Sequence, residues 1–154
     1  METPSFTFPL ERVRSLRERA EDRAREALSN ELRARDELVA ALRHAEEAVA
    51  SARGATRDAV TGGRVTSADL RSLQTFAERR EQLRAAASLD LDRQDAEVAA
   101  RREILTAAAR DRQAIDRLKE RRKAEHEAEW AVRIQNQLDE LALAMHRRGG
   151  PVAA

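Results

Sequence analysis

The stretch Thr61-Gly62-Gly63-Arg64 decides the fold, because it is the clear break between two long segments that favour helix. Adjacent glycines supply the positive φ angles that a chain reversal needs. Thr66 or Ser67 can cap a new helix after this turn, and Asp69 then lies near the positive end of that helix's dipole. The stretch therefore predicts two helices joined by a tight reversal.

The two helices are predicted to form a single coiled-coil domain over residues 1–154. We expect a helix at about 9–60, a turn at 61–66, a helix at about 67–148 and a disordered tail at 149–154. Pro9 suits a first helical turn, and Gly149-Gly150-Pro151 stops the second helix. Gly54 costs about 1 kcal/mol inside a helix, so we expect the first helix to fray from that point.

A repeat of seven residues marks the first helix as half of a left-handed coiled coil. Its positions alternate by three and four residues and are mostly alanine: Val13, Arg17, Ala20, Ala24, Ala27, Glu31, Ala34, Leu38, Ala41, Ala45, Ala48, Ala52, Ala55 and Ala59. The stripe is widened by its neighbours Leu28, Leu32, Val39, Leu42 and Val49. Because alanine buries little surface, we expect close helix axes and a pairing of modest stability.

The second helix carries a stripe that extends beyond the reach of the first. It contains Leu70, Leu73, Ala77, Leu83, Ala87, Leu91, Val98, Leu105, Ala108, Ile115 and Leu118, and resumes with Trp130, Ile134, Leu138, Leu141 and Met145. At 1.5 Å per residue, the first helix spans roughly 75 Å and the second roughly 120 Å. In an antiparallel pair Leu10 lies near Leu118, so the region from Lys119 to Arg148 overhangs. An unpaired apolar stripe marks a surface for a partner or for self-association.

The composition supports a long helical protein and excludes several classes. Charged residues make up 37% of the 154 residues and aromatic residues 3%, as is typical of coiled coils. The 29 basic and 28 acidic residues nearly cancel, which argues against a general nucleic-acid binder. The absence of cysteine excludes disulfides and thiolate metal sites. We expect a soluble intracellular protein, because no apolar run reaches about 20 residues and the N-terminus lacks signal features.

The sequence contains no pattern that indicates catalysis. His44, His126 and His146 are scattered without metal-ligand spacing, so we interpret them as solvated surface residues. Acidic residues are interleaved with arginine, which leaves them ionised on solvated faces. No phosphate loop or nucleophile motif is present, and a two-helix coil offers no enclosed pocket. We therefore predict no enzymatic activity, no metal, no cofactor and no small-molecule substrate.

Four features are candidates for contacts. The basic segment Arg117–Lys123 is either a solvated face or a contact with an acidic partner. Phe76 is either a core residue at the turn end of the hairpin or an exposed anchor for a partner. Trp130 lies in the overhang, which favours binding. The segment Phe6–Leu10 is expected to staple the start of the first helix to the second.

Several motifs together resemble those of the flagellar export protein FliJ family over nearly the whole chain. They are the opening Phe6-x-Phe8-Pro9-Leu10-Glu11-Arg12-Val13, an Arg- and Ala-rich helix, a hairpin near residue 62, Leu118-Lys119-Glu120-Arg121-Arg122, and Leu138-Asp139-Glu140-Leu141-Ala142. The resemblance implies a non-enzymatic component of the flagellar type III export apparatus, serving flagellum biogenesis and motility. It also implies a two-helix coiled coil similar to the central stalk of rotary ATP synthases.

The resemblance further implies three partners. The hexameric export ATPase would bind the end where both termini meet, and the export gate protein FlhA and export chaperones would bind elsewhere. The implied location is cytoplasmic, peripheral at the cytoplasmic face of the inner membrane at the flagellar base. The family's gate-binding segment follows the hairpin and includes an aromatic residue, which Phe76 matches. Four residues later the family prefers an apolar residue, and here the residue is Arg80.

We hypothesise that the overhang, with Phe8 to Val13 nearby, enters the ATPase ring. The predicted partner-binding residues are Leu73, Phe76, Trp130, Ile134, Leu138, Leu141, Met145, Phe8 and Val13. Other readings are the stalk protein of an injectisome type III system, a structural scaffold that only dimerises and, least favoured by the balanced charge, a nucleic-acid binder. A scaffold would self-associate through the overhang, whereas a stalk would be monomeric alone.

Overall fold

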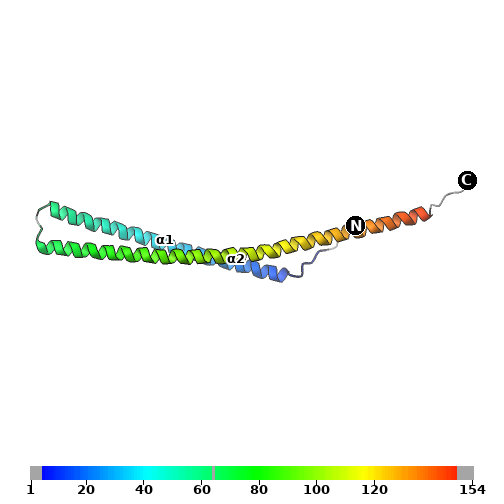
Figure 1. Cartoon of the computed structure of the whole chain (residues 1–154), viewed down its shortest axis with the longest axis horizontal. Coiled ribbons are helices and arrows are strands. Elements are labelled where there is room, and N and C mark those ends of the chain that lie inside the picture. Colours follow the sequence, from blue (N-terminus) through cyan, green and yellow to red (C-terminus); the bar gives the residue numbers. More distant parts are fainter. Residues whose placement is uncertain (1–4, 64, 149–154) are drawn as a thin grey trace. The chain divides into compact units, whose positions relative to one another are not determined.

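The computed structural model describes residues 5–63 and 65–148, which contain two helices, α1 (Glu11–Thr61) and α2 (Ser67–Arg148) (Figure 1). The predicted tail at 149–154 lies outside the described residues. The predicted all-α fold is confirmed, since α1 and α2 pack against each other and the described residues include no strand. The chain divides into two units, each containing part of both helices. We call Glu21–Ala108 the turn unit, and the described residues before and after it the terminal unit.

Helix α1 begins after a turn at Pro9 and Leu10. The Glu11 amide donates a hydrogen bond to the Phe8 carbonyl at 3.2 Å, and the Arg14 amide donates to the Leu10 carbonyl at 2.9 Å. Helix α1 continues without a break through Gly54, where fraying was expected to begin, to Thr61. Neighbouring helical turns therefore offset the helix penalty of one glycine.

The reversal between the helices uses the turn residues that the sequence indicates. Gly63 has a φ of 67°, a conformation that favours glycine, whereas the Gly62 amide bonds to the Asp58 carbonyl at 2.9 Å and extends the end of α1. Thr66 caps α2: its amide and its hydroxyl donate to the Asp69 carboxylate at 3.1 and 2.7 Å, and the Asp69 amide donates to its hydroxyl at 3.2 Å. These hydrogen bonds from Thr66 lower the pKa of Asp69.

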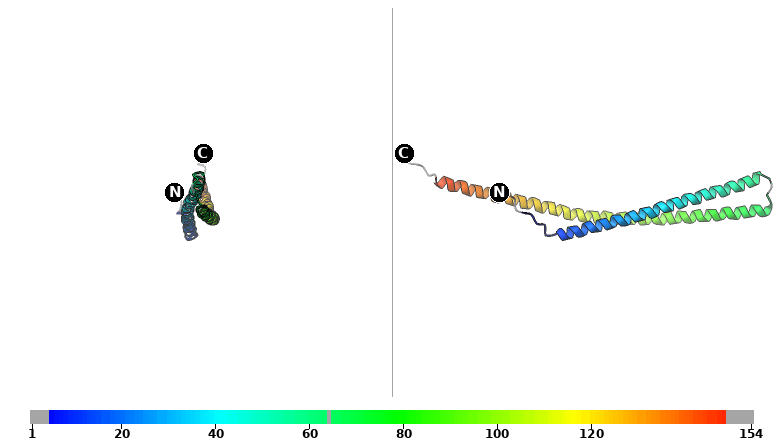
Figure 2. Two further views of the ribbon diagram at one scale, coloured as in Figure 1. Left: turned by 90° about the vertical axis from the view of Figure 1, so that its left-hand side faces the viewer. Right: turned by 180° about the vertical axis from the view of Figure 1, so that it is seen from behind.

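In the turn unit the two helices run antiparallel from this reversal (Figure 2). Arg35 donates to Asp95 at 2.6 Å, and Arg53, further along α1, pairs with Glu81, earlier in α2. Residue numbers therefore rise along α1 while they fall along α2, as a hairpin requires.

The α1 seam differs in part from the predicted alanine stripe. The predicted stripe consists of two columns, each made of positions seven residues apart. One of these columns is buried or half-buried from Ala24 onward: Ala24, Glu31, Leu38, Ala45, Ala52 and Ala59. In the other predicted column Ala20, Ala41 and Ala55 are exposed. The second seam column instead lies one residue later and is made of Glu21, Leu28, Arg35, Leu42, Val49 and Thr56. Most of these side chains are larger than alanine, so this register removes more apolar surface from water.

The α2 seam contains polar residues that the apolar stripe leaves out. Arg84, Gln94 and Arg101 are half-buried at seam positions, whereas Leu83 is exposed. Gln94 donates to the Glu31 carboxylate at 2.8 Å, and Arg101 lies 3.4 Å from its other oxygen. A polar layer in a coiled-coil seam specifies the register of the helices at a cost in stability. This layer holds one register along a seam of small residues.

The seam assignment predicts different costs for the same truncation at two valines of α1. Val49 is 6% exposed, so Val49→Ala should lower the free energy of unfolding by about 1–2 kcal/mol through lost burial. Val60 is 58% exposed, and Val60→Ala is the matched control, expected to change stability by less than about 0.5 kcal/mol. Urea unfolding followed by circular dichroism measures both. Equal losses in the two variants would contradict the assigned seam.

Candidate partner-binding surfaces

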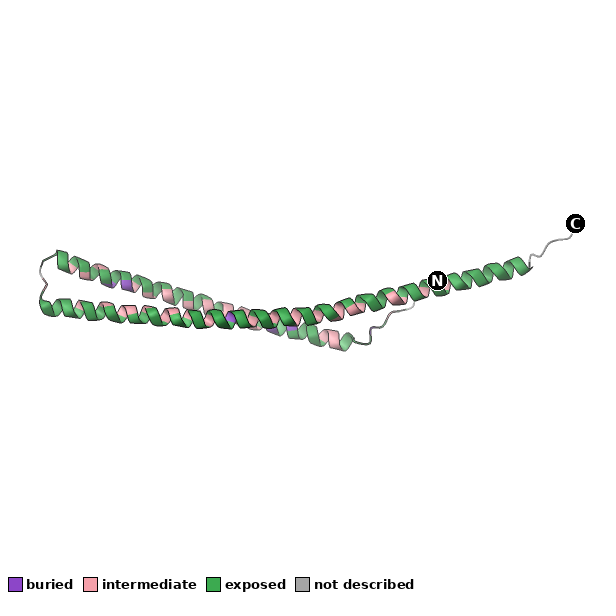
Figure 3. Cartoon of the chain, in the orientation of Figure 1, coloured by how far each residue is buried: buried purple, intermediate pink, exposed green. Residues whose placement is uncertain are grey.

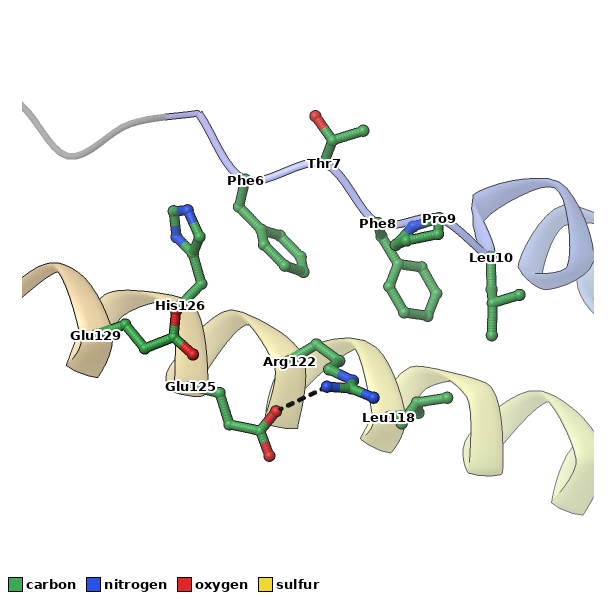
Figure 4. Close-up of a pocket in the computed structure, with 10 residues that line it drawn as sticks. All are labelled: Phe6, Thr7, Phe8, Pro9, Leu10, Leu118, Arg122, Glu125, His126 and Glu129. Atoms are coloured by element: carbon green, nitrogen blue, oxygen red, sulfur yellow. Dashed lines mark hydrogen bonds and ion pairs between the residues drawn. The ribbon is translucent and has the colours of Figure 1, made fainter.

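The N-terminal segment of the terminal unit packs on α2 before α1 begins (Figure 4). Phe8 is buried, with the Lys119 ammonium 6.0 Å from its ring centre. The Phe6 ring lies 6.5 Å from the Phe8 ring and 5.6 Å from the His126 ring. The predicted staple between this segment and the second helix is therefore present. Phe8, a predicted partner-binding residue, is available to a partner only if the segment leaves α2.

A cavity of about 440 Å³ lies between this segment and α2. Its walls are mainly apolar on the segment's side, from Phe6 to Leu10, and charged on the α2 side, where Arg122, Glu125 and Glu129 line it. Arg122 donates to Glu125 at 3.3 Å. His126, which the sequence suggested to be solvated, is half-buried against Phe6.

Three ion pairs between α1 and α2 hold the terminal unit together. Arg14 donates to Asp116, Arg17 to Asp111 and Lys119 to Glu11, each at 2.8 Å. The hydrogen bond from Lys119 lowers the pKa of Glu11, and that from Arg14 lowers the pKa of Asp116. Val13, another predicted contact residue, is half-buried beside these pairs.

Sequence reasoning had the signal for these pairs but did not use it. Opposite charges recur along the two helices in reversed order, at Glu11, Arg14 and Arg17 on α1 and at Asp111, Asp116 and Lys119 on α2. In an antiparallel pair such charges face each other. Apolar periodicity alone cannot identify them, because they flank the seam.

The end of α2 presents an apolar face to solvent. We call residues 130–147 the overhang. Most of this helix end is exposed (Figure 3). Trp130 and Ile134 are half-buried, whereas Leu138, Leu141 and Met145 are exposed, Met145 by 72%. In the terminal unit, the N-terminal segment and α2 line a common cavity that extends along α2 from Leu118 to Glu129. A shallow hollow of about 450 Å³ involves Leu141 and Ala144.

The remaining predicted contact residues, Leu73 and Phe76, belong to the turn unit. Leu73 is half-buried at a seam position. Phe76 is 46% exposed, and the Arg80 guanidinium lies 4.8 Å from its ring centre. The structure thus favours the exposed alternative for Phe76 over the core alternative.

Two other kinds of site are absent from the part of the chain that the structure describes. No group of three or more histidine, aspartate or glutamate side chains there is placed to hold a metal ion. Neither described helix has a stretch that is long and apolar enough to cross a lipid bilayer.

Comparison with known proteins gives one match. The family model described as flagellar FliJ protein matches residues 6–151. That range includes the N-terminal segment, both helices and the overhang. No curated protein and no solved structure matches the chain.

The lowered pKa of Asp116 predicts how its ion pair responds to acid. Because the folded-state pKa lies below the unfolded value, the stabilisation is fully present above about pH 5 and is lost as pH falls through the folded pKa. Asp116→Asn should therefore be less stable than the parent chain at pH 7, and the difference should shrink below about pH 4. Urea unfolding at pH 7, 5 and 3 measures this difference.

Asp36→Asn is the control for this titration. Asp36 is exposed, and it forms no ion pair with any described residue. We expect its unfolding free energy to follow that of the parent chain at each pH. A constant destabilisation by Asp116→Asn from pH 7 to pH 3 would contradict the assigned pair.

Proposed function

The chain belongs to the flagellar FliJ family, and from this premise we propose that the overhang binds the export ATPase and stimulates its assembly and hydrolysis. Family membership makes the chain a component of the flagellar type III protein export apparatus. The proposal adds which partner the overhang binds and what the binding does.

The observation that carries the proposal is the exposed apolar face of the overhang. Leu138, Leu141 and Met145 lie in solvent, and no described residue of α1 packs on them. Fully burying a side chain of this size contributes about 1.5–3 kcal/mol. A partner that covers these residues would therefore gain enough free energy for specific binding.

Ion pairs along α2 just before this face support binding to a defined partner over unspecific aggregation. Lys123 pairs with Glu127 at 3.8 Å and Arg133 with Glu129 at 3.5 Å along the helix. Such exposed pairs add little stability, but they keep the other faces of the helix hydrated. A single helix with one apolar stripe can enter a narrow site between the subunits of a ring, as an amphipathic helix enters a groove.

We propose that the turn unit serves the other partners. Phe76 and the neighbouring seam residue Leu73 are the proposed contact for the export gate protein FlhA. The exposure of the Phe76 side chain supports this role. Export chaperones would use the exposed faces of the hairpin. The proposed location follows from these partners: the chain would be peripheral at the cytoplasmic face of the inner membrane at the flagellar base.

We also propose that the chain acts as a regulator and carries out no chemistry itself. The carboxylates with lowered pKa values, Glu11, Asp69 and Asp116, have stabilising partners in the chain. Those partners, Lys119, Thr66 and Arg14, hold them as anions in structural roles. Hydrolysis would belong to the ATPase, and the overhang would alter its assembly.

The test compares two triple variants of the full chain, each of which replaces three exposed apolar side chains with serine. Leu138→Ser/Leu141→Ser/Met145→Ser removes the overhang face, whereas Leu16→Ser/Leu89→Ser/Ile104→Ser removes exposed side chains elsewhere. ATP hydrolysis and hexamer formation by the cognate export ATPase are measured against chain concentration. We expect the first variant to need at least about tenfold more protein for half-maximal stimulation, since each lost contact contributes about 1 kcal/mol or more.

The control variant should stimulate the ATPase as the parent chain does. Circular dichroism must show that both variants remain helical. Equal stimulation by the two variants would refute the assignment of the overhang. Absence of stimulation by the parent chain would refute the proposed function itself.

A further inference from the structure

Two large apolar side chains of the turn unit stand in solvent on one face of α2. Phe76 is 46% and Leu83 is 51% exposed. They are separated by two helical turns, so they project from the same side of the helix. Seam residues such as Leu73 and Ala77 are half-buried, so this pair lies outside the contact with α1. An exposed pair with helical spacing is suited to hold the side chains of a second helix.

Arginines surround this pair. Arg79 and Arg80 follow Phe76 by three and four residues and precede Leu83 by four and three, so they lie between the two apolar side chains. Arg71 and Arg79 line a hollow of about 460 Å³ beside Phe76. We call Phe76, Leu83, Arg71, Arg79 and Arg80 the arginine face.

None of the three arginines pairs with a carboxylate of the described chain. Arg71 donates to the Ser67 carbonyl at 3.2 Å, and Arg80 lies over the Phe76 ring. The guanidinium charges of the arginine face are therefore available to a partner.

The acidic residues nearby are already engaged. Asp69 accepts hydrogen bonds from Thr66. Glu81 is bonded by Arg53 and Arg84, and Glu78 accepts from Gln74. Thr66 and Gln74 are uncharged, so only Glu81 is paired with arginines. From Asp69 to Arg84, four arginines and three carboxylates still leave a net charge of +1.

We propose that the arginine face binds an acidic amphipathic helix of a partner protein. The apolar residues of that helix would cover Phe76 and Leu83, and its carboxylates would bond to Arg71, Arg79 and Arg80. The arginine face includes Phe76, the proposed contact for the export gate protein. The inference adds which chemistry the bound segment of that protein would have, and in that respect it rests on the proposed function.

The contact between Arg80 and Phe76 explains how one surface can bind both the apolar side chains and the carboxylates of a partner helix. The guanidinium, 4.8 Å from the ring centre, is held over the aromatic face by the cation–π interaction. Its N–H groups remain able to donate to a carboxylate in a bidentate arrangement. A partner residue that covers the exposed part of the ring would place a neighbouring carboxylate close to Arg79 and Arg80.

A protein helix fits this surface better than a membrane does. Helices that lie in a bilayer interface present a broad apolar face. Here only two large apolar side chains are exposed, and the acidic residues Glu78 and Glu81 lie between them in the sequence. The spacing of Phe76 and Leu83 instead matches the heptad of a partner helix.

The test uses the full chain and two synthetic helical peptides that share one apolar stripe. One peptide carries glutamate and the other lysine at every flanking position. Binding is measured by fluorescence anisotropy at peptide concentrations where sedimentation shows monomers, and vesicles of phosphatidylglycerol serve as the membrane probe. The variants are Arg79→Glu/Arg80→Glu, Phe76→Ala and the matched control Arg102→Glu/Arg110→Glu. Arg102 and Arg110 are exposed arginines of α2 outside the arginine face.

We expect the acidic peptide to bind the parent chain at least tenfold more tightly than the basic peptide does. Arg79→Glu/Arg80→Glu should reverse that preference, Phe76→Ala should weaken binding of both peptides, and the control should leave the preference unchanged. Equal binding of the two peptides, an equal effect of the control, or tighter binding to the vesicles than to the acidic peptide would overturn the proposal.

The same variants separate this proposal from the proposed function. Arg79→Glu/Arg80→Glu should stimulate the export ATPase as the parent chain does, because the overhang is unchanged. Loss of stimulation by the parent chain would count against the proposed function and leave the peptide result standing.

Discussion

A two-helix coil has one contact face per helix, so the length of the shorter helix sets how much of the longer helix can be buried. Here α1 has 51 residues and α2 has 82. In the terminal unit the N-terminal segment extends the cover on α2 as far as Glu129, and the apolar stripe continues beyond it. The exposed face of the overhang is a direct consequence of this difference in length.

The pairing itself has little apolar surface to hold it. Only Phe8, Ala24, Val49, Ala52 and Val98 are buried apolar residues among those described. Phe8 lies before α1, and two of the other four are alanines, which bury little surface. Specificity comes from polar contacts: Glu31 with Gln94 and Arg101 in the turn unit, and Arg14 with Asp116 in the terminal unit. Such contacts add modest stability but select one register. A helix pair built in this way keeps most of its surface available to partners.

The sequence predicted two helices, a turn at 61–66 and a cap at Thr66 or Ser67, because turn and cap chemistry depend on local residues. The structure selects Thr66 as the cap. It placed Ala24 and Ala52 in the seam correctly but also placed Ala55 there, which is exposed. Alanine fits either column of the heptad, and only the larger neighbours Val49 and Leu42 decide between them. The exposure of Phe76 and the burial of Phe8 depend on contacts with residues distant in sequence. Helical periodicity does not predict such contacts.

The central claim is that the overhang is the surface that binds the export ATPase. Hydrogen exchange of the full chain, measured by mass spectrometry with and without its cognate ATPase, tests it most directly. An unpaired helix end exchanges readily, so a bound partner must slow it. We predict slower exchange in residues 130–147 and unchanged exchange in Ser67–Ala108 when the ATPase is added. Slower exchange confined to the turn unit, or unchanged exchange throughout, would contradict the account.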